Sequence, residues 1–187
     1  MAFLGIVVPE EAARVLAGHE VPGVPTSTHT QHCTMLYLGK QVPIDDICAA
    51  IRAVFDVANQ TKPFTCSVSG IGSFPANPDD GVPVIGRLDQ TDIMAVREAV
   101  RAQFDQDGVP YSNKYPDYTP HVTLAYADEQ VPDRPIDPVV WTCSRLTMWC
   151  GDVDDDGMVV EIPLGGTGDT VEAAIKVITA ALHLNRS

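Results

Sequence analysis

The chain has 187 residues and a mass of 20.1 kDa, the size of one ordinary domain with a single hydrophobic core. Hydrophobic residues make up 45% of the sequence and charged residues 20%, values typical of soluble globular proteins and not of disordered or membrane proteins. Twelve Lys and Arg against 25 Asp and Glu give a formal net charge of −13, which repels long polyanions, so we expect no sequence-independent binding of long DNA or RNA.

The predicted elements alternate between strands and helices along the chain. Residues 44–58, for example, carry Ile47, Ile51 and Val54 at helical spacing, with Asp45 in the first turn. We expect strands at 2–8, 33–38, 64–68, 82–88, 122–126, 141–149 and 158–162, and helices at 10–17, 44–58, 93–104 and 170–184. Residues 19–31 and the Gly- and Pro-rich stretch between 68 and 82 are expected to be loops. This order predicts an α+β fold.

No Pro- or Ser-rich linker divides the chain, so we expect one domain over residues 1–164. Residues 165–187 are expected to form a Gly-rich link and a C-terminal amphipathic helix. The apolar stripe of that helix either docks on its own domain or supports a homo-oligomer. Because charged residues interrupt it, this segment is not expected to cross a membrane.

The start of the chain and the cysteines indicate where the protein works. The first eight residues are apolar but lack a basic lead and run into Pro9, so we expect no signal peptide. Five cysteines without a C-x-x-C spacing favour neither a disulfide framework nor a zinc site. We therefore expect a cytoplasmic protein, or one in the host cytoplasm if it is virus-encoded.

One short motif occurs twice in register. The segment His-Cys-Thr-Met-Leu-Tyr at 32–37 returns as His-Val-Thr-Leu-Ala-Tyr at 121–126. Because side chains alternate along a strand, the His and Thr of each copy share one face, and the apolar residues between them face the core. Two such copies predict two lobes related by a pseudo-two-fold axis, which brings two imidazoles and two hydroxyls together.

Two histidines and two threonines suit the cleavage of a phosphodiester. That reaction needs a base for the attacking oxygen, an acid for the leaving oxygen, and donors for the non-bridging oxygens. Since the ordinary pKa of histidine is near 6.5, one His of a pair can be neutral while the other is charged. We therefore predict His32, Thr34, His121 and Thr123 as the catalytic residues, with no metal and no cofactor.

The sequence resembles the 2H phosphoesterase superfamily, which includes 2'-5' RNA ligase-like proteins and cyclic phosphodiesterases. The resemblance lies in the block at 32–39, the block at 119–125, and the glycine-rich Ser-Gly-Ile-Gly-Ser-Phe-Pro at 69–75. It implies a bilobal fold, with two pseudo-symmetric sheet-and-helix lobes around a central cleft. It also implies metal-independent chemistry by the two His and two Thr.

Further residues are candidates for substrate binding or for metal binding. Tyr115 and Tyr118 precede the second motif and are candidates to stack on a base, the equal alternative being surface-loop aromatics without that function. Trp149, on a late strand, is a third candidate, for which packing in the core is the favoured alternative. The acidic stretch at 152–157 begins like a calcium loop, but Pro163 stands where a bidentate Glu is required, so we expect a hairpin turn. His29 and His32 form an H-x-x-H without further ligands, so no zinc site is expected.

The leading functional hypothesis is a phosphodiesterase that acts on a small cyclic nucleotide or cyclic oligonucleotide. Proteins of the resembling superfamily include enzymes that open 2',3'-cyclic phosphates and virus-encoded nucleases that destroy cyclic oligonucleotide signals (anti-CBASS). An RNA end-processing 2'-5' ligase or 2',3'-cyclic phosphodiesterase is one alternative. A non-catalytic nucleotide-binding adaptor is the other. The expected partner is a small nucleotide or short oligonucleotide, not a membrane.

Overall fold

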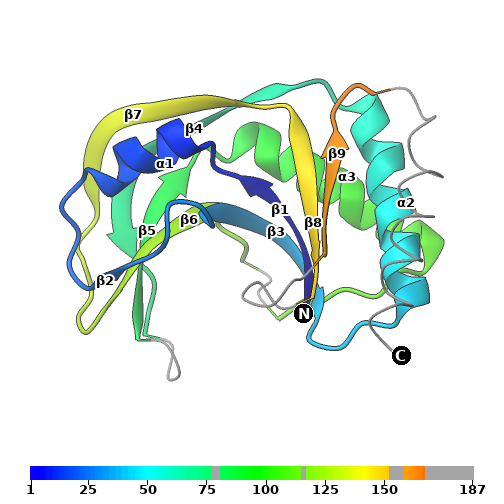
Figure 1. The fold of residues 1–187 in the computed structure, drawn as a ribbon, viewed down its shortest axis with the longest axis horizontal. Coiled ribbons are helices and arrows are strands. Elements are labelled where there is room, and N and C mark those ends of the chain that lie inside the picture. The colour runs from blue at the N-terminus through cyan, green and yellow to red at the C-terminus, as the bar shows by residue number, and fades with distance from the viewer. Residues whose placement is uncertain (77–80, 115–116, 152–157, 167–187) are drawn as a thin grey trace.

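The structure, a computed structural model, describes residues 1–76, 81–114, 117–151 and 158–166 (Figure 1). The expected C-terminal helix and the acidic stretch at 152–157 lie outside the described residues. The elements are β1 (Ala2–Val7), α1 (Glu10–Ala17), β2 (Val24–Pro25), β3 (His32–Gly39), α2 (Ile44–Gln60), β4 (Phe64–Ser73), β5 (Val82–Leu88), α3 (Thr91–Asp107), β6 (His121–Ala127), β7 (Arg134–Cys143), β8 (Arg145–Cys150) and β9 (Met158–Pro163).

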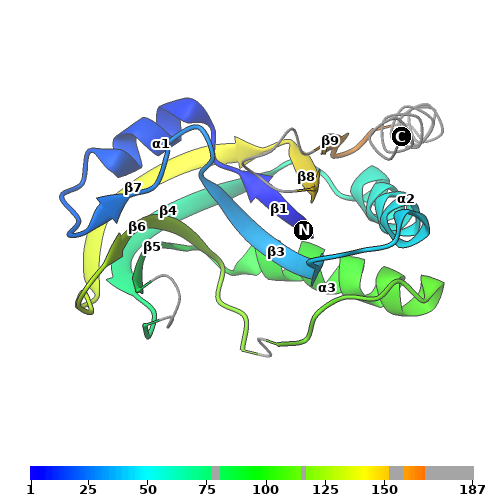
Figure 2. The same ribbon diagram turned by 60° about the horizontal axis from the view of Figure 1, so that its bottom comes forward.

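The strands form two antiparallel sheets, which confirms the α+β prediction. One sheet has the order β3-β1-β8-β9 and the other the order β2-β6-β5-β4-β7. Each H-x-T strand lies in its own sheet, β3 in the first and β6 in the second, as the repeat predicts. The lobes are nevertheless not successive halves of the chain, because β2 joins the second sheet and β8 and β9 return to the first (Figures 1 and 2).

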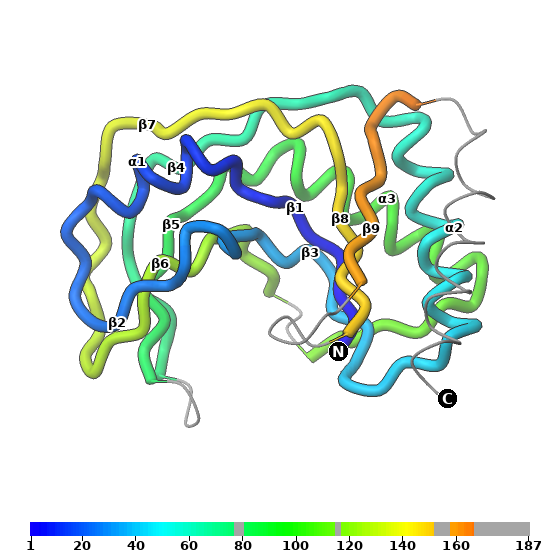
Figure 3. Tube along the Cα trace, in the orientation of Figure 1, coloured from blue at the N-terminus to red at the C-terminus, as the bar shows by residue number. Residues whose placement is uncertain are grey.

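The prediction of one strand over residues 141–149 is wrong, because the structure has two strands there, each in a different sheet. β7 ends at Cys143 and pairs with β4, whereas β8 begins at Arg145 and pairs with β1. Ser144 and Arg145 are both exposed, so the alternation of buried and exposed residues is interrupted at this point. The chain passes from one sheet to the other here, as the tube trace shows (Figure 3).

The loop predicted after residue 68 is also shorter than expected. β4 continues through Gly70 and Gly72 to Ser73, and its register against β5 shifts between Val68 and Gly70. A strand can contain glycines where a bulge forms or where other groups must approach the backbone closely. The short strand β2, inside the expected loop at 19–31, pairs with the end of β6.

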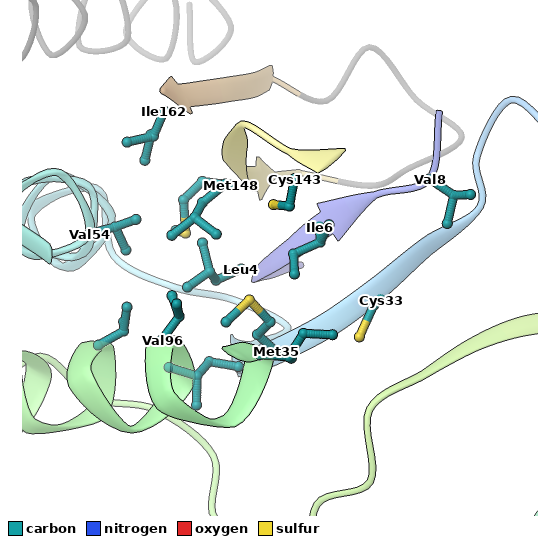
Figure 4. Close-up of a cluster of buried hydrophobic side chains, with 14 of the residues drawn as sticks. Leu4, Ile6, Val8, Cys33, Met35, Val54, Val96, Cys143, Met148 and Ile162 are labelled. Atoms are coloured by element: carbon teal, nitrogen blue, oxygen red, sulfur yellow. The ribbon is translucent and has the colours of Figure 1, made fainter. Parts of the chain in front are cut away.

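The helices cover the sheets around one contiguous core. α2 packs on β8 and β9, α3 packs on β3 and β4, and α1 packs on β7. Figure 4 shows Leu4 of β1 among Val54 of α2, Val96 of α3 and Met148 of β8. The apolar positions Ile47, Ile51 and Val54 of α2 are buried, as the helical spacing predicts. Among the described residues, no helix has both the length and the apolar character that crossing a membrane requires.

Candidate active site

The two H-x-T strands meet where the two sheets adjoin. β3 contacts β6, and His32 and His121 are the first residues of these strands (Figures 1 and 2). The two motifs are 89 residues apart in sequence, and the strands that carry them are nevertheless in contact. The structure therefore brings the two copies of the motif together at one seam.

Each motif shows the predicted alternation, followed by the same irregularity. His32 and Thr34 are half-buried, as are His121 and Thr123, while the residues between them are fully buried. Directly after each Thr the register to the neighbouring strand shifts by one residue. Two successive residues, Met35 with Leu36 and Leu124 with Ala125, are consequently buried. A bulge at this point bends both strands alike, which keeps the His and Thr side chains on the open face.

The two imidazoles are held in the same orientation. Nδ1 of His32 lies 2.7 Å from the carbonyl oxygen of Thr30, and Nδ1 of His121 lies 2.8 Å from that of Thr119. Since a carbonyl can only accept, Nδ1 carries the proton and donates in both rings. Nε2 is therefore the atom that can take up or release a proton in each histidine.

Aromatic rings flank both histidines. Phe3 and Trp149 stack with centroids 4.6 Å apart, and each ring centroid is 5.1 Å from that of His32. Phe74 meets His121 edge to face, with the centroids 4.7 Å apart. These rings restrict the rotation of each imidazole and remove it from water. Trp149, predicted as a substrate-binding residue, thus lies beside His32, and its contact with substrate stays a prediction.

The surroundings lower the pKa of both histidines. Burial lowers the pKa of His32, and the hydrogen bond to the Thr30 carbonyl opposes that effect. Burial also lowers the pKa of His121, the Thr119 carbonyl opposes it, and the positive charges of His32 and Arg87 lower it further. The two imidazoles therefore lie close enough to influence each other, so that protonation of one disfavours protonation of the other.

The thiol between the first His and Thr does not compete as a nucleophile. Cys33 is fully buried, and burial raises its pKa to about 11, so the thiol stays protonated near neutral pH. By contrast, the Thr34 and Thr123 side chains are half-buried on the same face as the histidines. Neither hydroxyl hydrogen-bonds to another described residue, so both are available as donors.

Thr26, which the sequence did not single out, donates to the Thr123 carbonyl at 2.8 Å and supports that strand.

Tyr118 connects the two motifs through its hydroxyl group. It donates to the carbonyl of Thr34 at 2.9 Å and lies 3.3 Å from the Cys33 sulfur. Arg97 of α3 covers the ring at 4.4 Å and donates from Nε to the Met35 carbonyl, at the bulge. The hydroxyl is thus used inside the protein, and contact of Tyr118 with substrate stays a prediction. Tyr115 lies outside the described residues.

An ion pair that has no signature in the sequence borders His121. Arg87 of β5 is the direct cross-strand neighbour of His121, and its Nη2 lies 2.7 Å from Oδ1 of Asp133. The two partners are 46 residues apart in the chain, so no local pattern could have paired them. Within the described ranges, no three His, Cys, Asp or Glu side chains gather as a metal site would require.

The comparisons with known proteins identify the family. Two curled antiparallel sheets with few helices match the 2H phosphoesterase fold. The family model described as the 2'-5' RNA ligase superfamily matches residues 11–155. The chain belongs to this superfamily, whose members are 2H phosphoesterases. No curated protein matches the chain in sequence.

Solved structures share the fold at low sequence identity. TT0787 of Thermus thermophilus is 20% identical, with a TM-score of 0.70, covering 88% of this chain and 98% of that one. LigT of E. coli, complexed with 3'-AMP, is 21% identical, with a TM-score of 0.61 and coverage of 86% and 94%. A crystal structure titled phosphoesterase is 21% identical, with a TM-score of 0.61 and coverage of 87% and 94%. These matches support the fold of the whole described domain.

Proposed function

We propose that the protein is a metal-independent phosphodiesterase that hydrolyses a small cyclic nucleotide or cyclic oligonucleotide by general acid-base catalysis with two histidines. The observation that carries this proposal is the matched pair of imidazoles. Both rings are anchored through Nδ1 to the carbonyl two residues earlier, which leaves two Nε2 atoms for proton transfer at one seam. His32, Thr34, His121 and Thr123 are the proposed catalytic residues.

The proposed reaction needs one neutral and one protonated imidazole. Nε2 of the neutral histidine takes a proton from water as the water oxygen forms its bond to phosphorus. Nε2 of the protonated histidine gives its proton to the oxygen that leaves phosphorus. The Thr34 and Thr123 hydroxyls donate to the non-bridging oxygens, where negative charge accumulates. The products are a phosphate monoester and a free hydroxyl, on the two ends of a linear molecule where the substrate was a cyclic oligonucleotide, and the two histidines have exchanged protonation states.

The substrate size follows from charge. A net charge of −13 weakens the approach of long polyanions, whereas one or two phosphates can still be held locally at the seam. LigT of E. coli has been crystallised with 3'-AMP, with NADP+ and with phosphate, which are small phosphate-containing ligands. We therefore favour small substrates over structured RNA.

The test compares substrate classes side by side. 2',3'-cyclic mononucleotides, cyclic dinucleotides, cyclic trinucleotides and structured RNA with 2'-5' linkages are incubated with the protein at about 20 and 200 mM salt, which changes the Debye length severalfold. We expect better kcat/KM for the small substrates at low salt, where repulsion of RNA is least screened. Preferred cleavage or ligation of RNA, declining steeply with salt, would establish the RNA end-processing alternative. Binding without turnover of any substrate would indicate an adaptor.

Chelation of metals is expected to leave the activity unchanged. The imidazoles activate water and the hydroxyls neutralise charge, which are the functions that a divalent ion performs in metal-dependent phosphodiesterases. The measurement is the initial rate after dialysis against EDTA, compared with the rate after readdition of Mg²⁺, Mn²⁺ or Zn²⁺. A rate that vanishes on dialysis and returns with one ion would contradict the two-histidine mechanism.

The pH profile of kcat/KM is expected to be a bell with its maximum below about pH 6.5. The profile of kcat/KM reports the free enzyme, in which the pKa values of both histidines are lowered from 6.5. As pH rises through the higher pKa, the acid loses its proton, and as pH falls through the lower one, the base gains one. The bound phosphate favours the protonated forms, so the kcat profile should lie at higher pH. A profile without an alkaline decline would contradict the shared roles.

A further inference from the structure

Arg87 lies next to the catalytic seam but takes no part in the mechanism above. It stands directly opposite His121 on the neighbouring strand, so both side chains project from the same face of the sheet. Its Nε and Nη2 both donate to one oxygen of Asp133, at 3.1 and 2.7 Å. The Arg87 side chain is 36% exposed, so a ligand on this face can reach it.

The backbone of β4 is shaped to receive this ion pair. A Cβ at Gly72 would collide with the Asp133 carboxylate and lie 3.1 Å from Nη2 of Arg87. Only a residue without a side chain lets the pair rest directly on the strand. Gly72 is the second glycine of the Ser-Gly-Ile-Gly block. The fold of β4 alone does not require a glycine here, whereas the ion pair does.

The guanidinium of Arg87 lies at a distance from the phosphodiester bond that is cleaved. β4 lies on the far side of β5 from β6, so a guanidinium over Gly72 is displaced away from the seam between His121 and His32. With neighbouring strands about 4.8 Å apart, β4 and β6 are separated by roughly 10 Å. A phosphate held between the two histidines therefore lies on one side of His121, and the cation lies on the other.

We propose that Arg87, oriented by Asp133 over Gly72, forms a subsite for a second phosphate of the substrate, one nucleotide away from the phosphodiester that is cleaved. The planar guanidinium suits a phosphate because it donates two parallel hydrogen bonds, and Nη1 is not used in the pair with Asp133. The inference rests on the proposed function and narrows its substrate class. It selects nucleotides with at least two phosphodiester groups, cyclic or linear, over cyclic mononucleotides.

The experiment pairs a change in the protein with a change in the substrate. The first substrate is a diadenylate ending in a 2',3'-cyclic phosphate, and the second is adenosine 2',3'-cyclic phosphate, which has the same scissile group without the second phosphate. The third is the diadenylate with an uncharged methylphosphonate as its internal linkage. For Arg87→Gln we expect about a tenfold loss of kcat/KM on the first substrate, mostly in KM, since one charge-assisted hydrogen-bonded pair is lost. Because the Arg87 charge also lowers the pKa of His121, each protein is assayed at its own pH optimum, where the loss on the other two substrates should be below about twofold.

A matched control is available in the other sheet. Arg145 of β8 pairs with Glu161 of β9 at 2.6 Å, and both of these side chains are exposed. Arg145→Gln should leave all three substrates unaffected. Gly72→Ala, which displaces the carboxylate without removing a charge, should reproduce part of the Arg87→Gln loss on the first substrate only. An equal loss on all three substrates in Arg87→Gln would overturn the subsite.

The subsite can also be measured without turnover. Calorimetric binding of the linear dinucleotides ApA and pApA, which differ by one terminal phosphate, is compared in the wild type and in Arg87→Gln. We expect the added phosphate to strengthen binding to the wild type and to have little effect on the variant. If no substrate is cleaved but this difference is found, the proposed activity is wrong and the subsite stands. If a substrate is cleaved but the wild type and Arg87→Gln gain the same affinity from the added phosphate, only the subsite is wrong.

Discussion

Replacing either His32 or His121 by alanine is expected to lower kcat at least about 100-fold, the usual contribution of a positioned general acid or base. Each histidine supplies an Nε2 that its partner cannot replace, because each ring is fixed by its own carbonyl. Thr34→Ala and Thr123→Ala should lose less, since one of several donors to the phosphate is removed. The measurement is kcat on the best substrate, with circular dichroism to show that the variants are folded.

The control for this series is a histidine close in sequence. His29 is exposed and lies three residues before His32, so His29→Ala should keep the wild-type rate. That variant also tests the H-x-x-H pair, because a zinc site would lose activity with either histidine. Wild-type activity in His32→Ala or in His121→Ala would rule out the two-histidine mechanism.

Gly5→Ala is expected to destabilise the fold by about 1–3 kcal/mol, the usual cost of forcing an extra methyl group into a packed site. A Cβ at Gly5 would lie 2.6 Å from the carbonyl oxygen of Cys33 and 3.1 Å from the ring of Trp149. The backbone carbonyl cannot move freely, since it belongs to β3 between His32 and Thr34. Urea unfolding should show a lower midpoint with an unchanged slope, and kcat should fall because the first motif shifts.

Gly70→Ala is the matched control for this substitution. Gly70 is also a strand glycine, but its Cβ would lie at an ordinary 3.5 Å from the carbonyl of Arg134. Its unfolding free energy should stay within about 0.5 kcal/mol of the wild type, because the space exists and alanine restricts the unfolded chain. Equal stability of the two variants would show that β1 and β3 can separate more easily than the packing indicates.

The local features of the site could be predicted from the order of residues alone. The two-residue period of a strand placed His and Thr on one face and Cys33 or Val122 on the other, and the structure confirms both assignments. The helical period of α2 likewise identified its buried face. Such patterns can be predicted because they depend only on neighbours a few residues apart, whose relative directions the backbone fixes.

Which distant segments meet could be learned only from the folded chain. The passage from β7 to β8 at Ser144, which looked like one strand, places the two strands in different sheets, because sheet pairing depends on partners far away in the chain. The bulges after Thr34 and Thr123, the Tyr118 hydroxyl on the Thr34 carbonyl, and the Arg87–Asp133 pair arise in the same way. The local pattern of a sequence predicts on which face of a strand or helix each side chain lies. The cross-strand register that brings Arg87 beside His121 is set only when the sheets form, because it depends on which distant strands pair.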